Sequence, residues 1–207
     1  MEKKKFTELD VEKLNIVDSN GKIKMTLFNQ ENIPPVILDG QDIMPGHRQD
    51  DPISGLMFYN GREEECGGLI FGSEEDEDGN PSMTASLTFD EYRQDQVVQM
   101  SYIEEKGQTQ YGFSVFDRPN RPLSHIVKAH REIESSDMSD EEKETAYKAL
   151  YKGNAPRAFM GKSQNGDVSM KLMDSKGKDR IRMVIDENDE PRMEFLNAHG
   201  EVTYKLP

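Results

Sequence analysis

The sequence has little of what several large classes of protein require. It contains a single cysteine, Cys66, so no disulfide can form within the chain. Hydrophobic residues make up 34% of the chain, and the mean hydropathy is -0.84. No run approaches the ~18 apolar residues of a transmembrane helix. The lysines near the N-terminus are not followed by an apolar segment, so we expect no signal peptide. These features predict a cytoplasmic protein that does not bind membranes.

Basic residues are also scarce. The chain has 26 Lys and Arg against 40 Asp and Glu, which gives a formal net charge of -14. A protein that binds nucleic acid needs a basic face to neutralise phosphates, so we expect no nucleic-acid partner. The acidity itself indicates solubility rather than a particular ligand.

Motifs for metals and cofactors are missing from the sequence. The four histidines have no second ligand at zinc-binding spacing. The acidic stretch SEEDEDGNPS resembles a calcium loop around Gly79, but Ala85 stands where the bidentate glutamate is required. There is no phosphate-binding glycine loop and no G-x-S-x-G or H-E-x-x-H motif. We therefore expect no metal site and no cofactor.

The sequence does contain regular alternation of apolar and polar residues. The C-terminal stretch DSKGKDRIRMVIDENDEPRMEFLNAHGEVTYKLP shows it three times, each time after a short polar turn. A period of two is typical of strands with one buried face. Asp174, Asp186 and Asn197 begin the turns, where Asp or Asn can bond to the backbone two residues on. Short connections of this kind make neighbouring strands antiparallel.

Related units at the N-terminus (LNIVDSNGKIKMTLF) and in the middle (GLMFYNGREEECGGLIFG) bring the count to about twelve strands. We predict an all-β fold in a single domain, residues 1–207: an antiparallel up-and-down meander. Closure into a barrel, or division into small propeller-like blades, would remove exposed edges. The Pro-rich segment 29–54 is predicted to be a long loop. Residues 123–152 show helical periodicity and a capping box at Ser139, which predicts a short α-helical insertion.

Two stretches stand out as candidate sites. Cys66 lies in ECGGLIFG, where acidic neighbours should raise the thiol pKa and Gly67-Gly68 should mark a bulge or a close backbone approach. The connection TFDEYRQDQVV is longer than a hairpin requires. Its polar side chains either form a small binding surface or shape a wide turn through bonds to the backbone. The candidate ligand or interaction residues are Asp90, Tyr92, Asp95, Gln96 and, from FDRPNRPL, Arg118.

Three stretches together resemble a family of uncharacterised small soluble bacterial proteins: ECGGLIFG, SLTFDEYRQDQVV and RIRMVIDENDEPRMEFLNAHGEVTYKLP. The resemblance covers most of the chain and implies a bacterial, intracellular protein. The family has no established activity, so the resemblance assigns no catalytic residue.

The sequence supports two hypotheses about function. The first is a non-enzymatic binding or protein-interaction module, favoured because no catalytic constellation is evident. The alternative is an enzyme or small-ligand binder with its site at one mouth of the meander, formed by Asp90, Tyr92, Asp95 and Arg118. A pocket with a perturbed carboxylate would favour the alternative. The partner is an unidentified protein or small molecule, and a homo-oligomer is compatible with the sequence.

Overall fold

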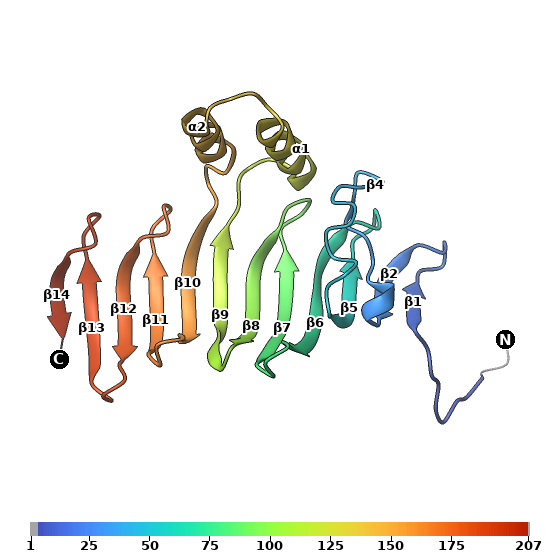
Figure 1. The fold of residues 1–207 in the computed structure, drawn as a ribbon, viewed down its shortest axis with the longest axis horizontal. Coiled ribbons are helices and arrows are strands. Elements are labelled where there is room, and N and C mark those ends of the chain that lie inside the picture. The colour runs from blue at the N-terminus through green and yellow to red at the C-terminus, as the bar shows by residue number, and fades with distance from the viewer. Residues whose placement is uncertain (1–3, 207) are drawn as a thin grey trace.

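The computed structural model describes residues 4–206, and one large antiparallel sheet dominates it (Figure 1). Twelve strands pair in chain order, so the predicted meander of about twelve strands is confirmed. They are β1 (Lys13–Val17), β2 (Ile23–Phe28), β5 (Ser54–Tyr59), β6 (Glu65–Glu75), β7 (Pro81–Asp90), β8 (Gln96–Glu105), β9 (Gln108–Asp117), β10 (Ala155–Lys162), β11 (Val168–Met173), β12 (Asp179–Ile185), β13 (Pro191–Leu196) and β14 (Val202–Leu206). A separate small sheet pairs β3 (Ile37–Leu38) with β4 (Gln41–Asp42).

The predicted closure into a barrel or propeller is wrong, because the sheet is open. Strands β1 and β14 form its two edges and lie at opposite ends of the molecule (Figure 1). Both edge strands have only five residues, fewer than any other strand of the large sheet. Short edge strands limit the unpaired backbone that a sheet presents, so this sheet manages its edges by length instead of closure.

The turns form as the sequence predicts. Asp174 Oδ1 accepts hydrogen bonds from the backbone N–H of Lys176 and Lys178, at 2.9 and 3.2 Å. The turns that begin at Asp18, Asp186 and Asn197 repeat this pair of bonds. A side-chain acceptor at the first position thus fixes each tight connection, and the antiparallel pairing of the adjacent strands follows.

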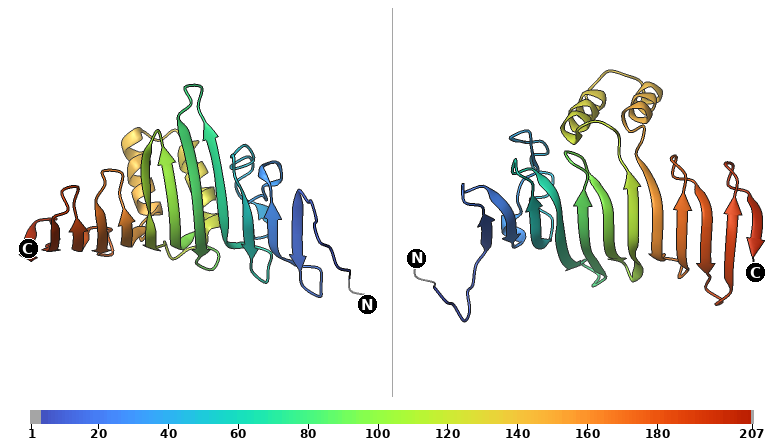
Figure 2. Two further views of the ribbon diagram at one scale, coloured as in Figure 1. Left: turned by 90° about the horizontal axis from the view of Figure 1, so that it is seen from below. Right: turned by 180° about the vertical axis from the view of Figure 1, so that it is seen from behind.

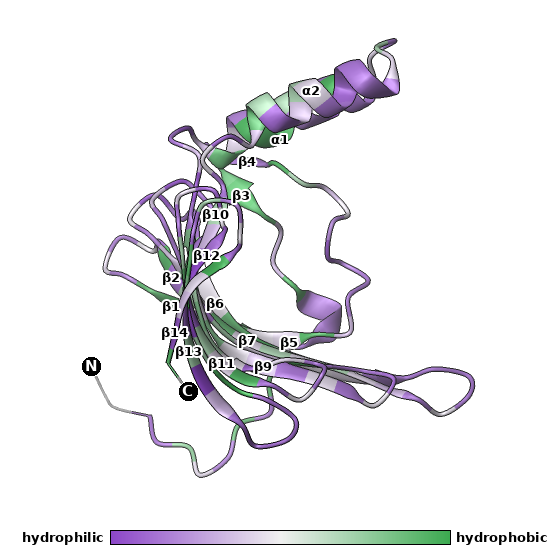
Figure 3. Cartoon of the chain, turned by 90° about the vertical axis from the view of Figure 1, so that its left-hand side faces the viewer, coloured by the Kyte–Doolittle hydropathy of each residue, from purple (hydrophilic) through white to green (hydrophobic). Residues whose placement is uncertain are grey.

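One face of the sheet is covered over part of its width. The Pro-rich loop, residues 29–53, joins β2 to β5 and contains η1 (Gln30–Asn32), β3 and β4. Helices α1 (Leu123–Glu134) and α2 (Asp140–Leu150) join β9 to β10, and α2 begins with the predicted capping box at Ser139. Figure 3 shows the loop and both helices on the same side of the sheet. A small core lies beneath the loop: Phe28, Ile33, Ile53 and Met57.

Strands β11 to β14 lie beyond this covering layer, and the views of Figure 2 show no other described element over them. On the face that continues the covered one, charged side chains pair across the strands. Glu194, only 6% exposed, accepts from Arg182 Nε at 2.7 Å and lies 3.4 Å from Arg192 Nε. Long charged side chains thus cover this part of the sheet themselves.

The opposite face of the sheet is apolar and open. Cross-strand pairing aligns one apolar residue from each of the twelve strands, and we call this set the apolar row. Its members, in sheet order, are Leu14, Leu27, Leu56, Leu69, Leu87, Met100, Phe113, Met160, Met170, Met183, Met193 and Leu206. The alternation was correctly predicted to segregate apolar side chains, but its apolar face is not buried: Met170 is 42% and Met183 48% exposed.

Within residues 4–206, the helices are too short and too polar for any of them to cross a membrane.

Candidate functional site

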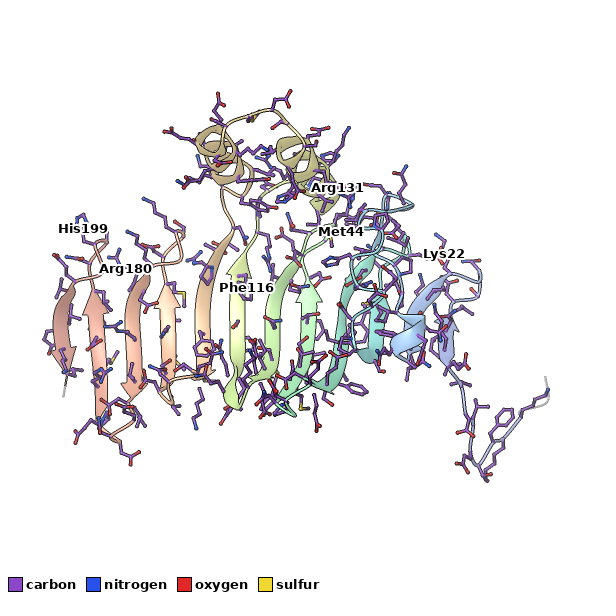
Figure 4. The ribbon with its side chains drawn as sticks, in the orientation of Figure 1. Lys22, Met44, Phe116, Arg131, Arg180 and His199 are labelled. Carbon is purple, nitrogen blue, oxygen red and sulfur yellow. The ribbon has the colours of Figure 1, made fainter. Side chains whose placement is uncertain are left out.

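A cavity of about 420 Å³ lies between the sheet and the covering layer. We call it the loop–helix cavity. The Pro-rich loop and α1 supply a mainly apolar wall, and the ends of β6, β7 and β8 supply a polar one. Figure 4 labels Met44, which lines the cavity from the loop, and Arg131 of α1, which shares an adjoining pocket with Met44. The lining residues are Val36, Leu38, Met44, His47, Arg48, Glu65, Asp90, Gln94, Asp95, Gln96, Leu123, Ile126, Val127 and Tyr151.

Two β-bulges aim polar side chains into this cavity. In the β5–β6 pair the register shifts between Met57 and Tyr59, and in the β7–β8 pair it shifts between Phe89 and Asp90. A bulge shifts the alternation of side chains by one residue. Glu65 and Gln96 are the first residues of β6 and β8, and the shift places both of them on the covered face. Without the two shifts, strict alternation would place both side chains among the apolar ones.

Gly67 makes the first bulge feasible, as the sequence predicts. Its φ is +129°, and a Cβ added there would lie 2.3 Å from the carbonyl oxygen of Thr88. Any side chain would therefore clash with the neighbouring strand. On the open face the rings of Phe58 and Phe89 stack at 6.4 Å between centroids, across the position where Gly67 has no side chain.

Asp90 is the most unusual group of the cavity. Burial, followed by the carboxylates of Glu65 and Asp95, raises the pKa of Asp90 to about 7, against a smaller opposing effect of Arg118 and Arg48. Within residues 4–206 no donor bonds to its Oδ1 atom, which is shielded from solvent. A half-buried carboxyl beside two other carboxylates holds its proton to higher pH than an exposed one, because ionisation would add a poorly solvated charge.

The other two acids of the cavity are paired. Arg48 reaches from the Pro-rich loop to Glu65 with both Nη atoms, and both side chains are less than a fifth exposed. Its Nε also donates to the carbonyl of Pro34 at 2.8 Å, so Arg48 fixes the loop as well as the acid. Arg118 lies 3.3 Å from Asp95 and donates from Nε to the carbonyl of Gln96 at 2.6 Å.

Gln94 anchors the connection between β7 and β8. Its side chain is 6% exposed and donates to the carbonyls of Pro119 and Arg121, at 2.9 and 2.7 Å, while its Oε1 accepts from the N–H of Asp95. The connection is therefore bound to the segment that leads into α1. This is the side-chain-to-backbone network that one reading of the sequence anticipated, and Gln94 is its centre.

A second brace holds the far side of the loop. Asp39, between β3 and β4, pairs with Arg93 and accepts from Ser124 Oγ at 2.8 Å. The backbone N–H of Asp39 donates to Glu64 Oε1 at 3.2 Å, and Glu64 is 1% exposed. Burial favours a raised pKa for Glu64, but hydrogen bonds from Asn60, Asp39 and Arg62 together outweigh it and lower the pKa.

The predicted site residues divide into three groups. Asp90, Asp95 and Gln96 line the cavity together, whereas Arg118 lies behind Asp95 and holds it. Tyr92 is 67% exposed at the tip of its turn and is not part of the lining. Sequence reasoning missed Arg48, Glu65 and Gln94. Only the long polar connection around Gln94 carried a local signal, because the pairing of Arg48 with Glu65 depends on how the loop folds back.

Cys66 lies next to this cavity, and its environment disfavours a thiolate. Burial raises the pKa of the thiol, and the carboxylates of Asp90 and Glu65 raise it further. The sequence predicts the effect of Glu65, which is its neighbour in the chain.

Comparison of the sequence with known protein families and with curated proteins finds no match to either. The resemblance to uncharacterised bacterial proteins therefore stays a prediction.

Proposed function

We propose that the protein is a non-enzymatic binding protein that takes a small ligand into the loop–helix cavity, and that this ligand joins a protonated amine to an apolar body. The observation that carries the proposal is Asp90: a half-buried carboxyl whose Oδ1 accepts no hydrogen bond from the described residues and whose pKa is about 7, in the lining of a cavity of about 420 Å³. That volume is within the range of small-molecule sites.

The charges of the cavity favour a cation. Glu65 and Asp95 each have an arginine partner, so the ionised form of Asp90 is the one charge left over. A bound ammonium group would compensate this charge and donate a hydrogen bond to the carboxylate. A charge-assisted bond of this kind in a desolvated site is stronger than a neutral one.

The rest of the ligand is expected to be apolar. Leu38, Ile126 and Val127 line the wall that faces the acids, and both Leu38 and Ile126 are 3% exposed. An aromatic or aliphatic body of a few carbon atoms would contact this wall, while its amine reaches Asp90.

A thermal-shift experiment with three probes of matched shape tests the proposal: 2-phenylethylamine, 2-phenylethanol and phenylacetate. At one hundred times Kd a ligand adds about 2.7 kcal/mol to the stability of the folded state. For a protein of this size the gain should raise Tm by roughly 5–10 °C. We expect such a shift with the amine, a smaller one with the alcohol and none with the anion. Equal shifts with all three probes would contradict the role of Asp90.

Asp90→Asn removes the ionisable group with almost no change of shape, and Asp137→Asn, in the exposed connection between the helices, is the matched control. The amine-induced shift should be lost in the first variant and unchanged in the second.

An enzyme is the second candidate, and the observation in its favour is the same pKa, since a group that titrates near pH 7 suits general acid–base catalysis. Mass spectrometry of the amine probe after incubation with the protein distinguishes a binding protein from an enzyme that converts the probe. A binding protein returns it unchanged.

A further inference from the structure

The apolar row is a feature that the loop–helix cavity does not use. Eight of its twelve members are at least 37% exposed, and Met100 and Met160 are 56% and 52% exposed. A second row beside it contains Ile181, Phe195 and Tyr204 in register. Exposed apolar surface on this scale marks an interaction site, because monomeric proteins seldom present contiguous patches of more than a few hundred Å².

The total surface supports the same conclusion. The chain exposes 14093 Å², whereas a compact monomer of 23.7 kDa is expected to expose about 9,800 Å². The excess of about 4,300 Å² is several times the roughly 800 Å² that each partner contributes to a standard interface. The apolar face contributes to this excess, since eight members of the apolar row are at least 37% exposed.

We propose that a second copy of this chain covers the apolar face, so that two sheets pack face to face in a symmetric dimer. Two twisted sheets pack this way with their inner faces about 10 Å apart and their strands within about 30° of each other. The apolar row of each copy would then cross that of its partner around a twofold axis. Such an interface is self-complementary, because each copy presents the same patch.

The length of the row favours a second copy as the occupant of the apolar face. Twelve strands about 4.8 Å apart make a sheet roughly 50 Å wide. A second copy offers an apolar face of the same width, because it carries the same apolar row.

The placement of charge also permits self-association despite the net charge of -14. Lys171, Arg182 and Glu194 pair across β11 to β13 on the opposite face, so they would point away from the interface. No member of the apolar row carries a charge. An acidic protein is a poor match for an anionic lipid surface, which makes a membrane the weaker candidate.

Light scattering coupled to size exclusion tests the proposal. At micromolar concentration we expect twice the chain mass of 23.7 kDa. A protein that stays at the mass of one chain would overturn the proposal, and so would one that reaches a larger particle only with lipid vesicles.

Two variants with equal changes of charge locate the interface. Met170→Lys with Met183→Lys places two charges on adjacent strands of the apolar row, and Ser175→Lys with Asn188→Lys places two in exposed hairpin turns. The first variant should run at half the mass of the wild type, whereas the second should remain a dimer. A dimer that withstands the first variant would overturn the proposal.

A measurement on the unmodified chain keeps the proposal testable if the first variant fails to fold. Methionine methyl groups can be followed by NMR while a soluble paramagnetic agent is added. Met100, Met160, Met170 and Met183 should be broadened several-fold less than Met138, which is 45% exposed between the helices. Equal broadening of all five would show that the face is open and would overturn the proposal.

Discussion

Arg48 and Glu65 meet through two hydrogen bonds, from Nη1 to Oε1 at 3.3 Å and from Nη2 to Oε2 at 2.8 Å. Arg48 belongs to the loop that leaves the sheet after β2, and Glu65 is the first residue of β6. The pair holds the loop over the cavity and neutralises one acid. Together with Arg118 and Asp95, it leaves Asp90 as the acid without a partner.

The first prediction concerns the pH dependence of stability. Asp90 has a pKa of about 7 in the folded protein and an ordinary value of 3.8 when unfolded. Between these values the folded state holds a proton that the unfolded chain has lost, so stability falls as pH rises from about 4 to 7 and levels off above that. The full effect is on the order of 4 kcal/mol.

Asp90→Asn should remove this component, so that the variant becomes more stable than the wild type above pH 7. Urea melts at several pH values, with Asp137→Asn as the control, measure the difference. Parallel profiles for the wild type and Asp90→Asn would mean that Asp90 ionises normally.

The second prediction separates Gln94 from Asp95. Gln94→Ala should lower the free energy of unfolding by about 1–3 kcal/mol, because the loss of its buried amide strands two carbonyls and an N–H. Asp95→Ala should cost less, since its side chain is 37% exposed and water can replace it. Denaturant melts of the two variants decide the matter. An equal or larger loss for Asp95→Ala would show that this side chain, rather than Gln94, shapes the turn.

The third prediction concerns Glu64. Its carboxylate accepts from the Asp39 N–H at 3.2 Å and from Asn60 Nδ2 at 3.1 Å. Glu64→Ala should destabilise the protein by roughly 2–4 kcal/mol, because both donors lose their acceptor in a buried place. Glu91→Ala, at an exposed turn position, is the matched control and should change little. Similar melting curves for the two variants would refute the brace between loop and sheet.

Much of the fold follows from local pattern. Alternation such as Ile181, Met183 and Ile185 defines a strand, and a leading Asp174 or Asn197 defines the turn, because both depend on residues close together in the chain. The same pattern does not reveal what lies against the strand's apolar side. Alternation alone therefore predicts a half-buried face and favours a closed sheet, whereas the sheet is open and no described element of the chain covers its apolar face over β11 to β14.

The candidate site was predictable only in part, for a related reason. Asp90, Asp95 and Gln96 belong to one continuous polar stretch, which could be recognised as unusual. Arg48 is 17 residues from Glu65 and meets it only when the loop folds back over the sheet. The bulges that turn Glu65 and Gln96 toward the cavity depend on register between strands, which the sequence pattern alone does not show.

The central claim is that Asp90 is the counter-charge for a cationic ligand. Proton release on binding tests this claim most directly. Calorimetric titration of 2-phenylethylamine at pH 6, in two buffers of different ionisation enthalpy, counts the protons exchanged. Asp90 is mostly protonated at this pH, because its pKa is about 7. The account predicts the release of close to one proton per bound amine from the wild type, and weakened binding without proton release in Asp90→Asn. Absence of binding, or binding to the wild type without proton release, would contradict it.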